Sequence, residues 1–228
     1  MTEISQIAHI ECDLKSKFAV PRQSGAVKEL KGKIVFEREY SEPEAFRGLE
    51  EYTYLWIIWQ FSQNTGRKWS PTVRPPILGG NTRVGVFATR SSFRPNNLAM
   101  SVVKIENVFR GTNGNMIIEV SGIDMMDGTP VFDIKPYIPK WDARNDACGG
   151  FTDKHEKQLL DVICDDRLLE CFDYEQKNTL IKLLEQDPRP AYKKNQDRSY
   201  GFLYADCEVK FHVEGMSLVV DTVEKIKK

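Results

Sequence analysis

The chain has 228 residues, of which 41% are apolar and 29% are charged, and its formal net charge is -1. This composition is too apolar for an intrinsically disordered chain, and the length allows a large core without disulfides or a structural metal. The near-zero charge argues at first against a nucleic-acid partner, although a whole-chain sum hides local asymmetry.

The first part of the sequence predicts strands in close succession. Charged and apolar residues alternate over 33–39, and the unbroken apolar run over 54–61 is typical of a buried strand. Ser41 to Glu44 has the pattern of a capping box and predicts a short helix through Phe46 and Leu49. Further strands are predicted at 84–89, 99–108, 116–122 and 131–134. Because only one short helix interrupts them, the pattern favours an antiparallel or mixed barrel or sandwich over βαβ units.

The character of the sequence changes near residue 142. A polar stretch with Gly149 and Gly150 predicts a linker, after which Asp153 and Glu156 suggest a second capping box and a helix over 159–163. A further helix is predicted over 174–186, followed by short strands at 209–213 and 218–220. We therefore expect a mainly β domain over residues 1–142 and a small α+β domain over 150–228.

The cysteines and the longest apolar run predict a reduced, soluble, cytoplasmic protein. The five cysteines are odd in number and irregularly spaced, with no CxxC pair, which argues against a disulfide framework and a zinc site. The start of the sequence has no signal-peptide pattern, and the run over 54–59 is far shorter than the ~20 residues of a membrane span. His9, His155 and His212 lie far apart, so no metal site is expected.

The charge distribution is strongly uneven. From Tyr52 to Ile105 the chain has no Asp or Glu but seven basic residues, so this segment carries +7 and the remainder -8. Buried strands that exclude acids would explain part of this, but most of the basic residues fall between strands, where loops carry function. No GxGxxG, GxxxxGK[ST] or GxSxG motif is present, so the common nucleotide cradles and the hydrolase elbow are unsupported.

Four sequence blocks are too particular for simple structural explanations. They are 17–23 (KFAVPRQ), 74–81 (RPPILGGN), 85–96 (GVFATRSSFRPN) and 124–137 (DMMDGTPVFDIKPY). In this order and spacing they resemble the TrmO family of S-adenosylmethionine-dependent tRNA (adenine-N6) methyltransferases, also called TsaA-like or YaeB-like. The resemblance covers about residues 7–139 and resumes at 187–192 (DPRPAY).

The resemblance implies a single-sheeted β-barrel that binds the methyl donor S-adenosylmethionine near the interface of a homodimer. It implies N6-threonylcarbamoyladenosine, next to the anticodon of threonine-type tRNA, as the substrate. The donor-contacting positions carried over are Pro21, Arg22, Gln23, Ser62, Gln63, Arg90, Met100, Asp127, Gly128, Thr129 and Pro130. Two positions depart from the family pattern, since Ser62 stands where His is frequent and Asn97 where Pro is frequent.

The chemistry of methyl transfer suggests roles for several of these residues. The donor's carboxylate suits Arg22, its sulfonium suits backbone carbonyls or Asp127, and the substrate's threonyl carboxylate suits Arg90 or Arg94. Asp133 and Tyr137 are candidate acceptors for the proton that the attacking nitrogen loses. The catalytic candidates are therefore Asp133, Tyr137 and Arg94. The expected RNA contacts are Arg67, Lys68, Arg74, Arg189, Tyr192, Lys193 and Lys194.

Two alternative functions would use the same residues. A non-catalytic RNA-binding barrel would use the basic segment without any donor. A donor-using enzyme that acts on a small metabolite would bind S-adenosylmethionine but show no salt-dependent affinity for tRNA.

Overall fold

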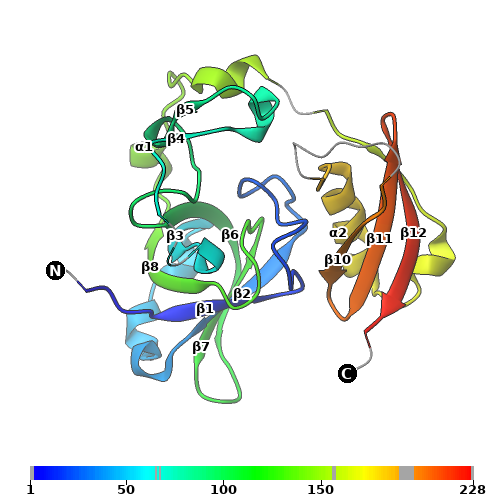
Figure 1. The fold of residues 1–228 in the computed structure, drawn as a ribbon. Helices are drawn as coiled ribbons and strands as arrows, with labels where there is room; N and C mark the ends of the chain where they lie inside the picture. The colour runs from blue at the N-terminus through cyan, green and yellow to red at the C-terminus, as the bar shows by residue number, and fades with distance from the viewer. Residues whose placement is uncertain (1–2, 65, 67, 156–157, 190–197, 227–228) are drawn as a thin grey trace.

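A computed structural model describes the chain except for residues 1–2, 65, 67, 156–157, 190–197 and 227–228. Its first domain is a closed barrel of six antiparallel strands in the order β1-β2-β7-β6-β3-β8 (Figure 1). The strands are β1 (Ala8–Cys12), β2 (Lys31–Phe36), β3 (Tyr54–Gln60), β6 (Leu98–Arg110), β7 (Met116–Ser121) and β8 (Pro130–Pro136). The predicted single-sheeted β-barrel is confirmed.

Alternation of side chains along each strand fills the barrel. Ile10, Ile34, Leu55, Ile57 and Ile118 are all fully buried inside it. The strand predicted at 54–61 is present, but only one of its faces is fully buried. Every second residue of β3 faces inward, while Tyr54, Trp56 and Ile58 on the other face are exposed or half-buried. The apolar run is unbroken in the sequence because the residues on the outer face of the strand are also apolar.

Short 3-10 turns replace some of the regular structure expected in this domain. No side-chain cap opens the predicted helix at 43–46, because the Ser41 hydroxyl instead donates to the Glu37 carbonyl and accepts from the Met116 N–H. The predicted strand over 84–89 shrinks to Val84–Gly85, because residues 86–88 turn into a 3-10 helix that leaves Phe87 71% exposed. The turns are Arg38–Tyr40, Pro43–Phe46, Leu49–Glu51, Ser62–Asn64, Pro76–Leu78 and Val86–Ala88.

A long excursion, residues 61–97, connects β3 to β6 and contains most of the basic segment. Its two short strands, β4 (Thr72–Val73) and β5 (Val84–Gly85), pair with each other outside the barrel sheet. Figure 1 shows this excursion projecting from one end of the barrel. After β8 the chain forms one helical turn, α1 (Pro139–Asp142), and a 3-10 turn, Gly150–Lys154.

The second domain is α+β, as the sequence predicts. Its sheet has the order β10-β11-β12-β9 and packs with α2 (Tyr174–Glu185). The strands are β9 (Asp161–Ile163), β10 (Tyr200–Tyr204), β11 (Cys207–Glu214) and β12 (Ser217–Lys225), with a 3-10 turn at Asp166–Leu169. A capping box of Asp173 and Gln176 opens α2. The prediction of a helix over 159–163 is wrong, because residues 161–163 pair in parallel with β12 at the sheet edge.

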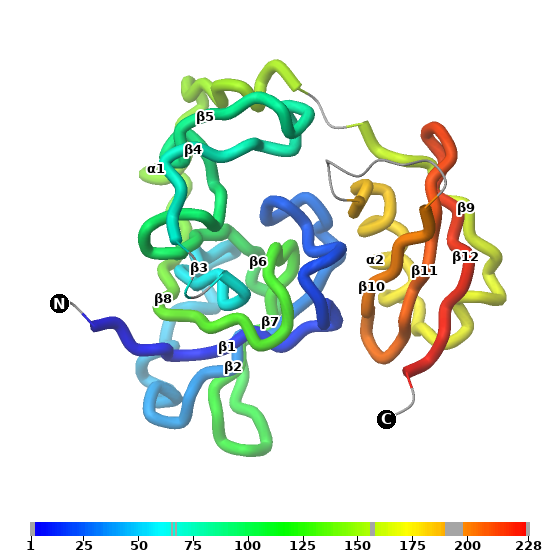
Figure 2. The backbone as a smooth tube through the Cα atoms, viewed as in Figure 1, coloured from blue at the N-terminus to red at the C-terminus, as the bar shows by residue number. Residues whose placement is uncertain are grey.

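The loop between β1 and β2, residues 13–30, lies between the two domains (Figure 2). In the part of the chain that the structure describes, no helix is long and apolar enough to cross a membrane.

Candidate active site

Antiparallel registers bring four of the predicted segments to one end of the barrel. Gln60 at the end of β3 pairs with Leu98 at the start of β6, and Trp59 pairs with Val131 of β8. On the other side of β8, His9 of β1 pairs with Pro130. The donor-contacting candidates after β1, after β3, at the start of β6 and before β8 therefore share this end of the barrel.

The turn from Asp127 to Pro130 is locked onto the end of β1. One carboxylate oxygen of Asp127 accepts the Cys12 N–H at 2.9 Å, and the other forms an ion pair with Lys15 at 3.0 Å. Gly128, at φ +72°, donates its N–H to the Ile10 carbonyl at 2.7 Å. Because both oxygens of Asp127 already have partners, this carboxylate shapes the turn rather than standing free for a sulfonium.

The loop after β1 places two of the predicted donor contacts at the surface. Pro21 is buried, whereas Arg22 and Gln23 are exposed. The Gln23 side chain donates to the Arg22 carbonyl at 2.6 Å and accepts a hydrogen bond from the Arg90 guanidinium. Two blocks far apart in sequence thus meet through side chains that the sequence had already singled out.

Arg94 organises the segment that carries Arg90. Its guanidinium donates to the Val86 carbonyl at 3.2 Å and to the Thr89 carbonyl at 2.7 Å, and it lies 5.5 Å from the centre of the Phe87 ring. These contacts fold residues 86–94 into a compact turn. They give Arg94 a structural task besides the substrate contact that the sequence suggests.

Asn97 explains one departure from the family pattern. Its backbone has φ +47°, in the left-handed region, and its side chain donates to the Asn64 carbonyl at 3.1 Å. Proline, whose φ is fixed near −65°, could not adopt this conformation. The turn before β6 therefore has a backbone conformation that asparagine tolerates and proline does not.

A series of hydrogen bonds between polar side chains, which the sequence did not predict, leads from the barrel interior to the site. The Trp59 indole donates to the Ser101 hydroxyl at 2.9 Å, and that hydroxyl donates to the Asp124 carboxylate at 2.6 Å. The Asp124 carboxylate also accepts the backbone N–H of Ser24, directly after Gln23. Burial raises the pKa of Asp124 above its usual range, while its hydrogen bonds and the charge of Arg90 oppose the rise. The sequence signal that could have identified Asp124 was its position at the start of the block 124–137.

The two candidate proton acceptors lie at different distances from the turn. One carboxylate oxygen of Asp133 forms an ion pair with Lys135 at 2.9 Å, and the other accepts the Ile134 N–H at 3.0 Å. Tyr137 packs against Tyr54 and Trp56 and follows β8, which has 7 residues. At ~3.3 Å per strand residue, Tyr137 is ~23 Å from Pro130 and Asp133 only ~10 Å. Within one chain the structure therefore brings Asp133, and not Tyr137, toward the donor candidates.

Of the three described members of the predicted RNA-contacting set, two are exposed to solvent and one is buried. Lys68 and Arg74 are exposed on the excursion. Arg189 is 7% exposed and forms a two-pronged pair with Asp187 at 2.8 and 3.0 Å, so it acts within the fold. The remaining members of the set lie outside the described residues: Arg67, Tyr192, Lys193 and Lys194.

The chemistry of these side chains fits S-adenosylmethionine. Exposed Arg22 suits a carboxylate, and the amides of Gln23 and Gln63, both exposed, can bond hydroxyls and ring nitrogens. Asn64, next to Gln63, has a buried side-chain oxygen without a hydrogen-bond partner among the described residues, which suits an N–H donor from a ligand. Among those residues no group of three or more His, Cys, Asp and Glu side chains could hold a metal ion.

The sequence and the structure both match known proteins along nearly their whole length. The tRNA-methyltransferase O N-terminal domain model matches residues 9–143, and the TrmO C-terminal domain model matches 158–226. An Escherichia coli (strain K12) protein named tRNA (adenine(37)-N6)-methyltransferase is 40% identical, with 97% of each chain covered. A Pseudomonas aeruginosa protein named putative S-adenosylmethionine-dependent methyltransferase RcsF is 35% identical, with 95% and 94% covered. A crystal structure of TrmO from P. aeruginosa superposes with a TM-score of 0.78 at 30% identity, covering 99% and 98%.

These matches define a tRNA methyltransferase built on a closed antiparallel barrel rather than on a doubly wound sheet. The resemblance carried by the four sequence blocks is confirmed. The chain belongs to the TrmO family.

Proposed function

We propose that the protein transfers a methyl group from S-adenosylmethionine to N6 of the adenosine at position 37 of tRNA, and that this adenosine carries the threonylcarbamoyl group. Membership of the TrmO family supports the reaction and the position. The observation that carries the assignment to this site is the contact between Gln23 and Arg90, which joins two donor motifs at one end of the barrel. The expected location is the cytoplasm, where tRNA is modified.

The residues of the site have different roles in an in-line displacement. When bound, the donor supplies a methyl group on a cationic sulfur: the N6–carbon bond forms, the sulfur–carbon bond breaks, and N6 loses its proton. Arg22 holds the donor's carboxylate and Arg90 the substrate's threonyl carboxylate, so that most of the catalysis is positioning. Asp133 is the nearer candidate for the proton acceptor, and Asp124 holds the backbone beside Gln23 in place.

Methylation of modified and unmodified tRNA tests this function. We expect labelled methyl to pass to threonine-type tRNA that carries the threonylcarbamoyl group and not to the same tRNA without it. Binding of tRNA should weaken steeply with salt, since the exposed Lys68 and Arg74 contact phosphates. If the donor binds but no label reaches either tRNA, a small-metabolite substrate is favoured. If tRNA binds but the donor does not, a non-catalytic RNA-binding module is favoured.

The outer face of β3 and β6 supports the proposed homodimer. Tyr54 (42% exposed) and Met100 (56% exposed) lie there with half-buried Trp56, Ile58 and Val102. An apolar patch on two neighbouring strands of the barrel suits a self-complementary contact between two copies. Met100, a predicted donor contact, is part of it, so the donor site adjoins this face.

We expect Met100→Glu to convert the dimer to a monomer, because a carboxylate in a two-fold contact is buried without a partner. Light scattering during gel filtration measures the mass. Glu39→Gln, at an exposed position in the turn after β2, is the control and should leave the mass unchanged. A Met100→Glu protein with the mass of the wild type would contradict this interface.

A further inference from the structure

The loop between β1 and β2 is held on two sides, and the donor-contacting candidates Arg22 and Gln23 lie on it. On the barrel side, Gly25 donates to the Gly122 carbonyl at 2.8 Å, and Gly122 donates to the Leu30 carbonyl at 2.9 Å. The same loop also faces the C-terminal domain (Figure 2). The position of Arg22 therefore depends on more than the barrel.

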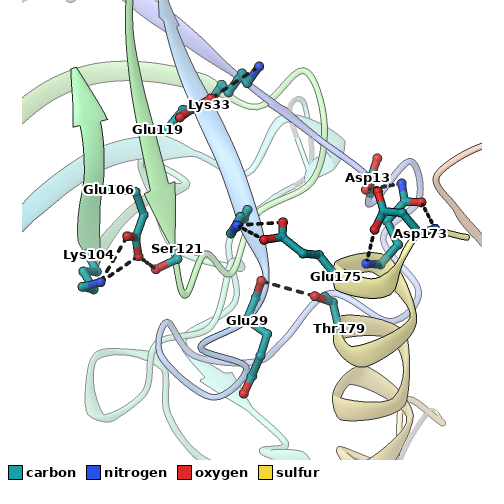
Figure 3. Close-up of polar contacts among 12 residues, drawn as sticks. Asp13, Glu29, Lys33, Lys104, Glu106, Glu119, Ser121, Asp173, Glu175 and Thr179 are labelled. Atoms are coloured by element: carbon teal, nitrogen blue, oxygen red, sulfur yellow. Dashed lines mark hydrogen bonds and ion pairs between the residues drawn. The ribbon is translucent and has the colours of Figure 1, made fainter. Parts of the chain in front are cut away.

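Hydrogen bonds from the C-terminal domain hold both ends of this loop. At its start, the Asp13 carboxylate accepts the Gln176 amide at 3.0 Å, and the Asp13 carbonyl accepts the Ala205 N–H at 2.8 Å. Near its end, the Glu29 carbonyl accepts the Thr179 hydroxyl at 3.2 Å. Figure 3 shows Asp13 and Glu29 facing the first turns of α2.

An aromatic contact fixes the middle of the loop. The Phe18 ring stacks on Tyr200 at 6.2 Å between centres and 16° between planes, and it lies 6.3 Å from Phe202 and 6.4 Å from Phe211. These three rings belong to β10 and β11. Phe18 thus links the block 17–23 to the aromatic residues of the C-terminal domain.

The residue after Phe18 has a strained backbone. Ala19 is 8% exposed and has φ +63°, in the left-handed region, although it is not glycine. Such a conformation persists only where the surroundings impose it, and it is common at ligand clamps. Phe18, which contacts the other domain, directly precedes Ala19, and buried Pro21, Arg22 and Gln23 follow within four residues.

We propose that the C-terminal domain positions the methyl-donor site. Packed against the aromatic residues of β10 and β11, Phe18 fixes the backbone at Ala19 and thereby sets Arg22 and Gln23 against Arg90. Phe18 is a positioning residue in this arrangement and does not touch the donor. The inference rests on the donor site of the proposed function. Because coupling between two sites is reciprocal, donor binding also strengthens the docking of the C-terminal domain.

Titration calorimetry of the full chain with S-adenosylmethionine tests the role of Phe18. We expect Phe18→Ala to raise the donor Kd about tenfold, within the usual range for coupled sites. In methylation assays the KM for the donor should rise with little change in kcat, a split that simple loss of folded protein would not produce. Phe18→Leu, which keeps an apolar side chain, should recover most of the affinity. Arg167→Gln, which breaks the exposed pair of Arg167 with Asp165 inside the C-terminal domain and away from the loop, is the control and should bind as the wild type does.

The outcomes separate this inference from the proposed function. An unchanged donor Kd in folded Phe18→Ala would overturn the positioning role while leaving the donor site intact. Should Phe18→Ala not fold, hydrogen exchange on the wild-type chain decides: donor binding is expected to slow exchange in α2 and β10, and unchanged exchange in both would refute the coupling. A wild-type protein that binds no S-adenosylmethionine would overturn both proposals.

Discussion

Arg90→Ala is expected to lower kcat/KM for methyl transfer between about 10- and 100-fold, with little change in the free energy of unfolding. Hydrogen bonds to charged groups are worth ~1.5–3 kcal/mol, and each ~1.4 kcal/mol is a factor of ten. Arg90 is exposed and bonds Gln23, which is exposed too, so the core does not depend on it. Initial rates with tRNA and denaturant unfolding measure the two quantities.

A double-mutant cycle tests whether Arg90 and Gln23 act together. If they form one unit, Gln23→Ala combined with Arg90→Ala should cost less than the sum of the two single changes. Arg110→Ala is the matched control, since Arg110 is also an exposed arginine but ends β6 and bonds the Gly114 carbonyl. Fully additive losses, or an equal loss in the control, would argue against a shared site.

Asp124→Ala is expected to destabilise the protein by about 3 kcal/mol and to impair methyl transfer. Removing the carboxylate leaves the buried Ser101 hydroxyl and the Ser24 N–H without their acceptor, and each unpaired buried group costs ~1–3 kcal/mol. Activity falls because Ser24 adjoins Gln23. Urea unfolding and donor calorimetry measure the two effects.

The raised pKa of Asp124 gives this prediction a pH dependence. Because the folded state binds the proton more tightly than the unfolded state, protonation of this carboxyl adds stability that is fully present at low pH. It is lost as pH rises from 3.8, the ordinary pKa, through the raised pKa of the folded state. Asp124→Asn does not titrate, so its stability relative to the wild type should rise across this window and then level. A difference that is constant with pH would contradict the raised pKa.

The strands of the barrel were predictable because their physical signal is local, whereas closure into a barrel rather than a sandwich came from the family resemblance. A strand with one face in a core must alternate, and β2, β6, β7 and β11 all carry that alternation or a β-branched run. The helix over 174–185 was equally clear from leucines on one side and a proline stop. The strand at 8–12 and the edge strand at 161–163 escaped prediction, because short segments draw their stability from their neighbours in the sheet.

The sequence by itself determined the family, the motifs and the basic segment without acids, because these depend on which residues are present and in what order. Only the tertiary structure decided which residues meet. It joined Gln23 to Arg90, tied Asp127 to Lys15, and placed Asp124 at the end of a chain from Trp59. It also seated Phe18 in the other domain. These contacts cross many residues of chain, and their energies arise from burial and register, which no local pattern encodes.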